Sequence, residues 1–167
     1  SLSVETTVFC HLSDDIIVVK KRFSTRPSGP DKLNISFNYM LTPGGNENTA
    51  PRRMVSECVY NENSNAVEYS YEADGYPYSE GLISIISDHP YIFSNDKQVA
   101  SLTSEISLSP DKPFELTYYI LFEDLIEGKD FQKRMAENQS MVRDEGYDRL
   151  SDSHQNAWSA YHDESYI

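Results

Sequence analysis

The feature that most constrains this chain is a series of strand-like segments with no helix-like segment between them. In residues 114–122, FELTYYILF, apolar residues stand at every second position and also fill two of the four positions in between. Side chains alternate between the two faces of a strand, so a segment that is apolar on both faces needs cover on both sides. Residues 114–122 are therefore predicted to form a central strand of a sheet.

Similar segments precede this one from the start of the chain. Alternation of apolar and polar residues is clearest in residues 2–12 and 33–41. A β-branched run at residues 16–19 predicts a strand covered on both faces, and residues 20–23 are expected to carry it out to the surface. The remaining strand-like segments are residues 54–60, 66–71, 82–86, 91–93 and 99–108.

Turn-forming residues separate these segments, most clearly at residues 13–15, 88–90, 94–96 and 110–113. About ten strands without intervening helices are typical of antiparallel sheets packed face to face. We therefore expect a mainly β fold, an antiparallel sandwich, over residues 1–124.

The sequence becomes helix-like after an acidic connector. Good helix formers begin at Phe131, and Phe131, Met135 and Val142 form an apolar stripe at helical spacing. Gly146 is expected to end this first helix. Residues 125–167 are thus predicted to form a helical linker after the sandwich.

A second helix is expected over the last residues of the chain, with an N-cap within residues 151–153. His154, Trp158 and Tyr161 are spaced by three and four residues, so they share one face of this helix. Trp158 is the only Trp in the chain. Because an aromatic face of this kind needs cover, we expect these three residues to pack against another domain.

The charge of the chain excludes several kinds of partner. There are 27 acidic residues against 14 Lys and Arg, a formal net charge of -13. Nucleic-acid binding is not expected, since it depends on neutralising phosphates, and an anionic membrane surface would repel the chain. No apolar run is long enough to span a membrane. The acidic excess is instead interpreted as a source of solubility.

The chain has two Cys residues, Cys10 and Cys58, and both fall in strand-like segments. Two Cys residues form neither a metal motif nor a disulfide framework. Two buried free thiols are the favoured interpretation. A single bridge between them stays open as the alternative.

Carboxylate pairs are the first catalytic candidates, because two of them can perform acid–base chemistry on a glycosidic bond. The candidates are Asp14 with Asp15, Glu57, Glu72 with Asp74, Glu80, Asp88, and Glu123 with Asp124. Most sit in turns, where Asp serves the backbone, and 27 acidic residues produce such pairs by chance. The four His residues are too dispersed to hold a metal ion. We therefore expect no catalytic residue, no metal and no cofactor.

One loop has the composition of a sugar-binding site. Tyr76 and Tyr78 stand beside Asp74 and Glu80, and flat aromatic faces with nearby carboxylates suit the apolar face and hydroxyls of a pyranose ring. The alternative is a Tyr-rich loop that packs on its own domain or on a neighbour. With the first interpretation, the chain would be a stand-alone carbohydrate-binding or adhesion module.

The end of the chain resembles a segment of glycoside hydrolase family 65, the group of maltose and trehalose phosphorylases and their relatives. The residues that match the family pattern H-x-x-A-W-x-x-x-W-x-x-S-x-I are His154, Ala157, Trp158, Ser165 and Ile167. His162 stands at the place of the second Trp, a departure that leaves open a related clan with the same domain plan. The rest of the chain is similar in architecture alone.

This resemblance implies an N-terminal β-supersandwich of the galactose mutarotase-like type, joined by linker helices to an (α/α)6 catalytic barrel. The catalytic acid of the family is a Glu of that barrel, so the resemblance implies a chain that is inactive alone. Its role would be to support the barrel of the same protein, which acts on α-glucosides by hydrolysis or phosphorolysis, and to contribute to a homodimer.

Overall fold

The computed structural model describes residues 1–11, 15–40, 53–63, 66–73, 81–96, 99–124 and 130–165. The strands are β1 (Leu2–Cys10), β2 (Ile16–Thr25), β3 (Lys32–Met40), β4 (Arg53–Asn61), β5 (Ala66–Ala73), β6 (Gly81–Ser87), β7 (Ile92–Asp96), β8 (Val99–Ser107) and β9 (Phe114–Asp124). They are followed by α1 (Phe131–Ser165). This order confirms the predicted succession of strands and then helices.

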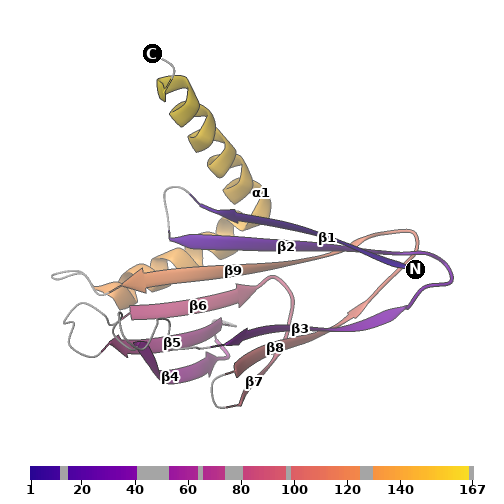
Figure 1. Cartoon of the computed structure of the whole chain (residues 1–167), viewed down its shortest axis with the longest axis horizontal. Coiled ribbons are helices and arrows are strands. Elements are labelled where there is room, and N and C mark those ends of the chain that lie inside the picture. Colours follow the sequence, from indigo (N-terminus) through magenta and orange to yellow (C-terminus); the bar gives the residue numbers. More distant parts are fainter. Residues whose placement is uncertain are drawn as a thin grey trace, which may run out of the picture.

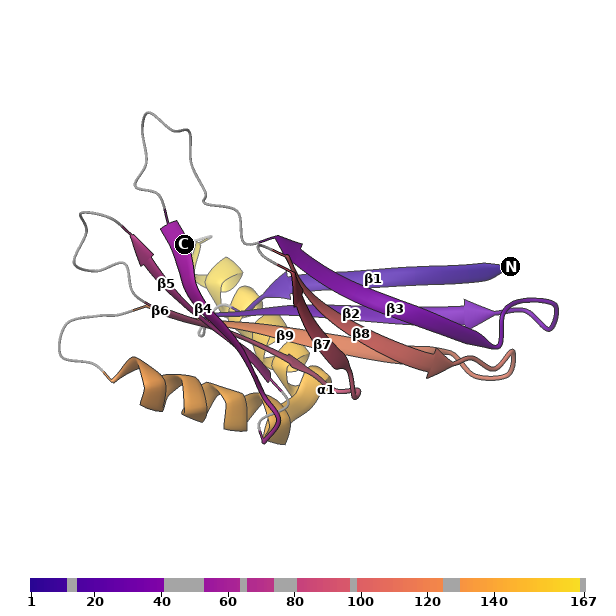
Figure 2. The same ribbon diagram turned by 90° about the horizontal axis from the view of Figure 1, so that it is seen from below.

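The strands form two antiparallel sheets, which Figures 1 and 2 show from two directions. The larger sheet has the order β1-β2-β9-β6-β5-β4, and the smaller has the order β3-β8-β7. β9 lies inside the larger sheet, paired with β2 on one side and β6 on the other. This position confirms the prediction of a central strand from its two apolar faces.

One face of β9 belongs to the core of the sandwich. Leu116 and Tyr118 of β9 are fully buried in a cluster with Leu102 and Ile106 of β8. β8 is the middle strand of the smaller sheet, so this cluster fills the space between the two sheets.

The expectation that residues 20–23 leave the sheet is wrong for Phe23. β2 pairs with β9 as far as Phe23, whose side chain is 5% exposed and belongs to the sandwich core. Lys20 and Arg22 alternate with it and therefore project from the other face. Strand alternation thus keeps Lys20 and Arg22 off the face of β2 that carries the buried Phe23 ring.

The other face of β9 packs against α1. Tyr119 and Leu121 form a second buried cluster with Met135, Val142 and Leu150 of the helix. Figure 2 shows the first half of α1 running along the face of the larger sheet that is turned away from the smaller sheet. The molecule therefore has three layers, and β9 contributes to both cores.

The start of α1 is capped and tied to β9. The Asp130 carboxylate accepts a hydrogen bond from the Lys133 N–H at 3.0 Å, so Asp130 is the N-cap. Glu123 of β9 is paired with Arg134 at 2.7 Å and accepts a hydrogen bond from the Asn138 side chain at 2.7 Å. These contacts hold the start of α1 against the last strand.

Gly146 divides α1 into two halves, as the sequence predicts. Its backbone has φ 65° and ψ -171°, a conformation that is essentially confined to Gly. The N-cap predicted within residues 151–153 is wrong, because the helix resumes at Tyr147 and these residues lie inside it. Gly146 changes the direction of the helix by itself, so the two halves of α1 need no linker with a new N-cap between them. Among the described residues, no helix is both long and apolar enough to cross a membrane.

Two smaller expectations are also corrected. The turn expected at residues 94–96 is strand, since β7 continues to Asp96, which pairs with Val99. Cys10 is a free thiol but is exposed rather than buried, because β1 is an edge strand. β1 and Cys58 of β4 lie at opposite edges of the six-stranded sheet, too far apart for a disulfide.

Candidate interdomain surface

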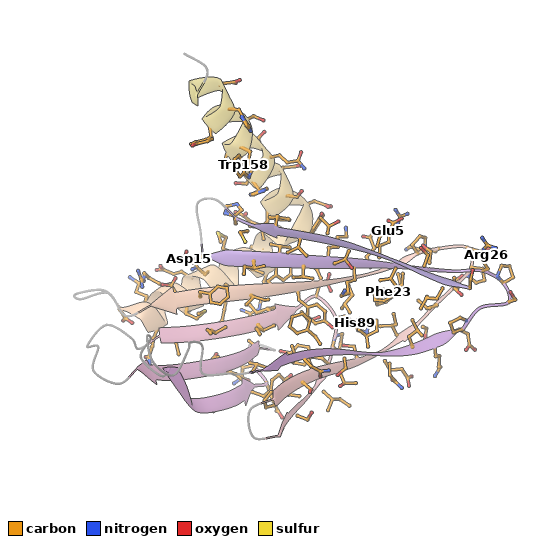
Figure 3. The ribbon with its side chains drawn as sticks, viewed as in Figure 1. Glu5, Asp15, Phe23, Arg26, His89 and Trp158 are labelled. Carbon is orange, nitrogen blue, oxygen red and sulfur yellow. The ribbon has the colours of Figure 1, made fainter. Side chains whose placement is uncertain are left out.

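The second half of α1 leads from the core to the solvent. Leu150 is fully buried, whereas Trp158 is 41% exposed and Tyr161 is 61% exposed. Figure 1 shows this half rising beyond β1, and Figure 3 places Trp158 on it, clear of both sheets. Six rings follow this path, and we call them the aromatic row: Phe9, Tyr147, His154, Trp158, Tyr161 and His162.

The aromatic row begins against β1. The Phe9 ring meets Tyr147 edge-on with centroids 6.0 Å apart, and it stacks on His154 at 4.8 Å. The buried ring of His11 lies 6.4 Å from the His154 ring. The Lys20 ammonium lies 4.0 Å from the centre of the Tyr147 ring, a cation–π contact. These contacts set the direction in which the helix leaves the sheet.

Trp158 connects the outer part of the row. Its ring centroid lies 6.3 Å from His154, 5.9 Å from Tyr161 and 5.8 Å from His162. The pairs with His154 and Tyr161 are edge-to-face, an arrangement that is favourable for aromatic rings, but the exposed fractions show that much of the ring surface still faces solvent. Exposed Trp and Tyr side chains of this kind are typical anchors of protein interfaces.

The structure brings together His154, Trp158 and Tyr161, the residues predicted for interdomain packing. Sequence reasoning missed Phe9 and Tyr147, because their contacts with the helix depend on where β1 lies. One signal was present: Phe9 interrupts the polar series of β1, in which Ser3, Glu5 and Thr7 precede it. An apolar residue on a polar face indicates local cover, which α1 provides.

The loop predicted to bind sugar lies outside the described residues. This applies to Asp74, Tyr76, Tyr78 and Glu80 alike, so the sugar-binding interpretation of these residues stays a prediction.

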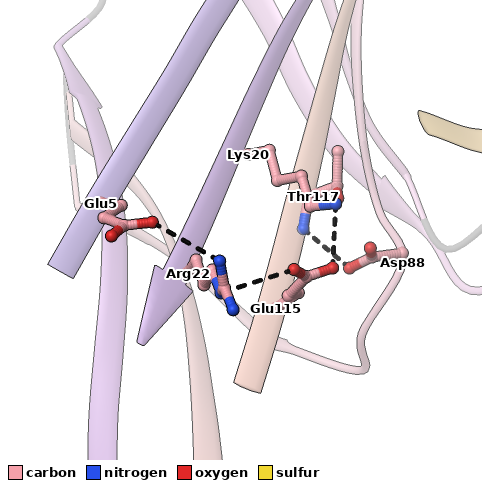
Figure 4. A network of polar contacts seen from close by, with 6 residues as sticks. All are labelled: Glu5, Lys20, Arg22, Asp88, Glu115 and Thr117. Carbon is pink, nitrogen blue, oxygen red and sulfur yellow. Dashed lines mark hydrogen bonds and ion pairs between the residues drawn. The ribbon is translucent and has the colours of Figure 1, made fainter. Parts of the chain in front are cut away.

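Two of the candidate catalytic carboxylates serve the fold. The Asp88 carboxylate accepts a hydrogen bond from the Thr117 N–H at 2.9 Å, and the Asp88 N–H donates to the Thr117 carbonyl at 3.1 Å (Figure 4). Glu123 is held by Arg134 and Asn138 at the start of α1. Both carboxylates are therefore explained by hydrogen bonding within the domain.

A groove of about 560 Å³ lies at the turn between β8 and β9. Its lining residues are Arg22, Ser107, Ser109, Lys112, Pro113, Phe114 and Glu115. Glu115 is its one carboxylate, and it pairs with Lys20 at 2.8 Å and with Arg22 at 3.9 Å (Figure 4). A carboxylate neutralised by two cations, without a second carboxylate in the lining, does not match the acid–base pair of a glycosidase.

No protein-family model and no curated protein matches this chain. A solved structure does match it, that of a presumptive kojibiose phosphorylase from the human microbiome. The TM-score is 0.72 at 9% sequence identity, and the match covers 95% of this chain and 21% of that chain. The chain thus spans about a fifth of the length of that phosphorylase.

At this identity the comparison establishes the fold alone. The chain is an antiparallel β-sandwich with a C-terminal helix, a fold like that of the N-terminal domain of family 65 phosphorylases. The match to a kojibiose phosphorylase supports the part of the family 65 resemblance that concerns the fold.

Proposed function

We propose that this chain is the non-catalytic N-terminal domain of a carbohydrate-active enzyme, a glycoside hydrolase or phosphorylase that acts on α-glucosides. The observation that carries the proposal is the match to the kojibiose phosphorylase, which covers 95% of this chain, sandwich and helix together. The structural uses of Asp88 and Glu123 agree with a domain that supports catalysis without performing it.

The aromatic row is the surface through which this domain would hold an (α/α)6 catalytic barrel of the same protein. Its inner part is fixed to β1, and its outer part presents Trp158 and Tyr161 to solvent. A rigid base with an exposed aromatic end suits a domain junction, because buried aromatic anchors supply most of the energy of such contacts. The kink at Gly146 directs this end away from the sandwich.

Activity assays test the proposal. Residues 1–167 alone are expected to neither hydrolyse nor phosphorolyse α-linked glucosides, while a longer protein that adds the following helical region is expected to do so. Robust turnover by residues 1–167 would refute the proposal, and so would a stop codon directly after Ile167. Glycan binding by this chain that is lost on Tyr76→Ala would instead favour the stand-alone module.

A further inference from the structure

The groove at the turn between β8 and β9 has an excess of positive charge, although the chain as a whole is acidic. The formal net charge of the chain is -13, whereas the lining of the groove includes two cations, Arg22 and Lys112, and one carboxylate, Glu115. Lys20, which lies outside the lining, already compensates this carboxylate at 2.8 Å (Figure 4). Asp111 belongs to the same turn but does not line the groove. The groove therefore presents positive charge to a ligand.

Both cations of the groove keep most of their hydrogen-bonding capacity. The Arg22 side chain is 50% exposed, and its contacts with Glu5 and Glu115 are 3.8 and 3.9 Å long, too long for hydrogen bonds (Figure 4). The Lys112 ammonium has no ion pair or hydrogen bond with any residue in the described ranges. A guanidinium can donate two parallel hydrogen bonds to an anion, and an ammonium adds a compact charge.

The turn also brings two hydroxyl groups into the lining of the groove. The Ser109 hydroxyl oxygen accepts a hydrogen bond from the Asp111 N–H at 3.3 Å, and the Lys112 N–H donates to the Ser109 carbonyl at 3.4 Å. These bonds fix the turn and leave the Ser109 hydroxyl hydrogen without an acceptor in the part of the chain that the structure describes. Ser107 adds the second hydroxyl group. Serine hydroxyls can donate hydrogen bonds to the oxygens of an anion.

One wall of the groove is apolar and is fixed by the core of the sandwich. It consists of Pro113 and Phe114. The Phe114 ring packs against the sandwich core and meets the His89 ring edge-on, with centroids 5.2 Å apart. A ring-shaped ligand can pack against a wall of this kind. The groove volume of about 560 Å³ leaves room for such a ring in addition to an anionic group.

We propose that this groove binds a small phosphate monoester, with the phosphate group held by Arg22 and Lys112 and the ring of the esterified alcohol against Phe114. A phosphate monoester carries close to two negative charges and three strong acceptor oxygens, which match two cations and two hydroxyl donors better than a carboxylate would. Sugar phosphates and nucleoside monophosphates share this chemistry. The proposal does not rest on the function proposed above, because it follows from the lining of the groove alone.

Isothermal titration calorimetry of residues 1–167 with glucose 6-phosphate and with AMP tests the proposal and shows which ring is preferred. Glucose, adenosine and inorganic phosphate are the reference ligands, because each carries only one part of the proposed chemistry. At least one monoester should bind about tenfold more tightly than its parent alcohol and than inorganic phosphate. Inorganic phosphate that binds as tightly as both esters would overturn the proposal, and so would the absence of binding by either ester at about 10 mM.

Two substitutions test the cations of the groove. Arg22→Gln and Lys112→Gln should each weaken binding of the preferred ester by about tenfold or more, because each removes a charged donor to the phosphate. The matched control is Arg26→Gln, which removes the same charge from an exposed position directly after β2, outside the lining (Figure 3). This variant should bind like the parent chain. Equal losses in Arg22→Gln and Arg26→Gln would indicate a general effect of charge and would overturn the site.

Two further substitutions test the carboxylate and the wall of the groove. Glu115→Gln should strengthen binding about threefold or more, because it removes the negative charge that faces Arg22. Phe114→Leu keeps an apolar side chain but removes the ring, and it should reduce the affinity for the ester to that for inorganic phosphate. Urea denaturation of each variant verifies that it is folded. Weaker binding by Glu115→Gln, or unchanged binding by a folded Phe114→Leu, would overturn this placement of the ligand.

Discussion

Tyr118 and Tyr119 are neighbours on β9, and they place their hydroxyl groups on opposite faces of the larger sheet. Burial, and after it the charge of Asp88, raises the pKa of both side chains to about 12. The Tyr118 hydroxyl is buried without a hydrogen-bond partner among the described residues, while Tyr119 is hydrogen-bonded to the Thr117 side chain. Removal of the two hydroxyls should therefore have different consequences.

Tyr118→Phe should leave the free energy of unfolding unchanged at neutral pH or raise it by about 1 kcal/mol, because it removes a buried polar group that lacks a partner. Tyr119→Phe should lower the free energy of unfolding by about 1 kcal/mol, since it removes a hydrogen bond. Urea denaturation of both variants measures the difference. A larger loss in Tyr118→Phe than in Tyr119→Phe would contradict this assignment.

The same tyrosines predict a loss of stability in alkali. Their pKa rises from 10.0 in the unfolded chain to about 12 in the folded one, so the folded state holds these protons more tightly. The stability that these protonated tyrosines give to the folded state is fully present below pH 10, and it is lost as the pH rises through 12. Urea midpoints between these values should fall less steeply in Tyr118→Phe than in the parent chain. If the urea midpoint falls equally steeply with pH in both proteins, the Tyr118 side chain does not contribute to the loss of stability in alkali.

At the scale of elements, the junction of β9 and α1 depends on one largely buried ion pair. The Glu123 side chain is 8% exposed. One of its carboxylate oxygens pairs with Arg134, and the other accepts a hydrogen bond from the Asn138 side chain. The Lys32–Glu105 pair at 3.2 Å offers the opposite case, because both side chains are more than 60% exposed. The two pairs have similar chemistry and different burial.

Glu123→Ala should lower the free energy of unfolding by about 3 kcal/mol, because it removes a largely buried carboxylate that pairs with Arg134 and accepts a hydrogen bond from Asn138. Glu105→Ala should change it by less than about 1 kcal/mol, since water screens an exposed pair. Denaturant titrations of both variants check this. Equal losses would show that the ion pair does not hold the helix to the strand.

The kink in α1 makes a second prediction for this element. A Cβ added at Gly146 would meet no atom within 4 Å, so the cost of Gly146→Ala comes from its backbone conformation alone. Such conformations cost about 1–3 kcal/mol in other residues, and the unfolding free energy should fall by that amount. Ser153→Ala, an exposed helical position, is the control and should be nearly neutral. If Gly146→Ala is equally neutral, the helix does not need the kink.

At the scale of the whole molecule, Trp158 reports on the proposed domain junction. It is the only Trp of the chain and is 41% exposed. Its fluorescence should therefore be red-shifted in residues 1–167 and shift to the blue in the longer protein that contains the barrel. The same emission maximum in both proteins would place Trp158 outside the junction.

Trp158→Ala tests the energy of the same contact. In residues 1–167 it should change the free energy of unfolding by no more than about 1 kcal/mol, because its ring partners in the described part of the chain all lie on its own helix and the ring is partly exposed. In the longer protein it should cost about 2 kcal/mol or more if the ring is an interface anchor. Equal effects in the two proteins, measured by denaturant unfolding, would refute the junction.

The sequence by itself determined the elements and their order. Period-two alternation marked the strands, and the apolar residues on both faces of residues 114–122 placed β9 inside a sheet. Gly146 marked the helix break, because its backbone conformation is nearly exclusive to Gly. These features are local, so they can be identified from spacing and residue type.

Only the tertiary structure decided which elements meet. The pairing of β9 with β2 and β6 joins distant segments, and it also decides that Phe23 is buried and Cys10 exposed. The stacking of Phe9 on His154 follows from where β1 lies under α1. Alternation assigns a side chain to a face, but the cover of that face depends on contacts between segments far apart in the chain. The sequence thus marked the aromatic end of α1, and the fold showed which of its rings stay exposed.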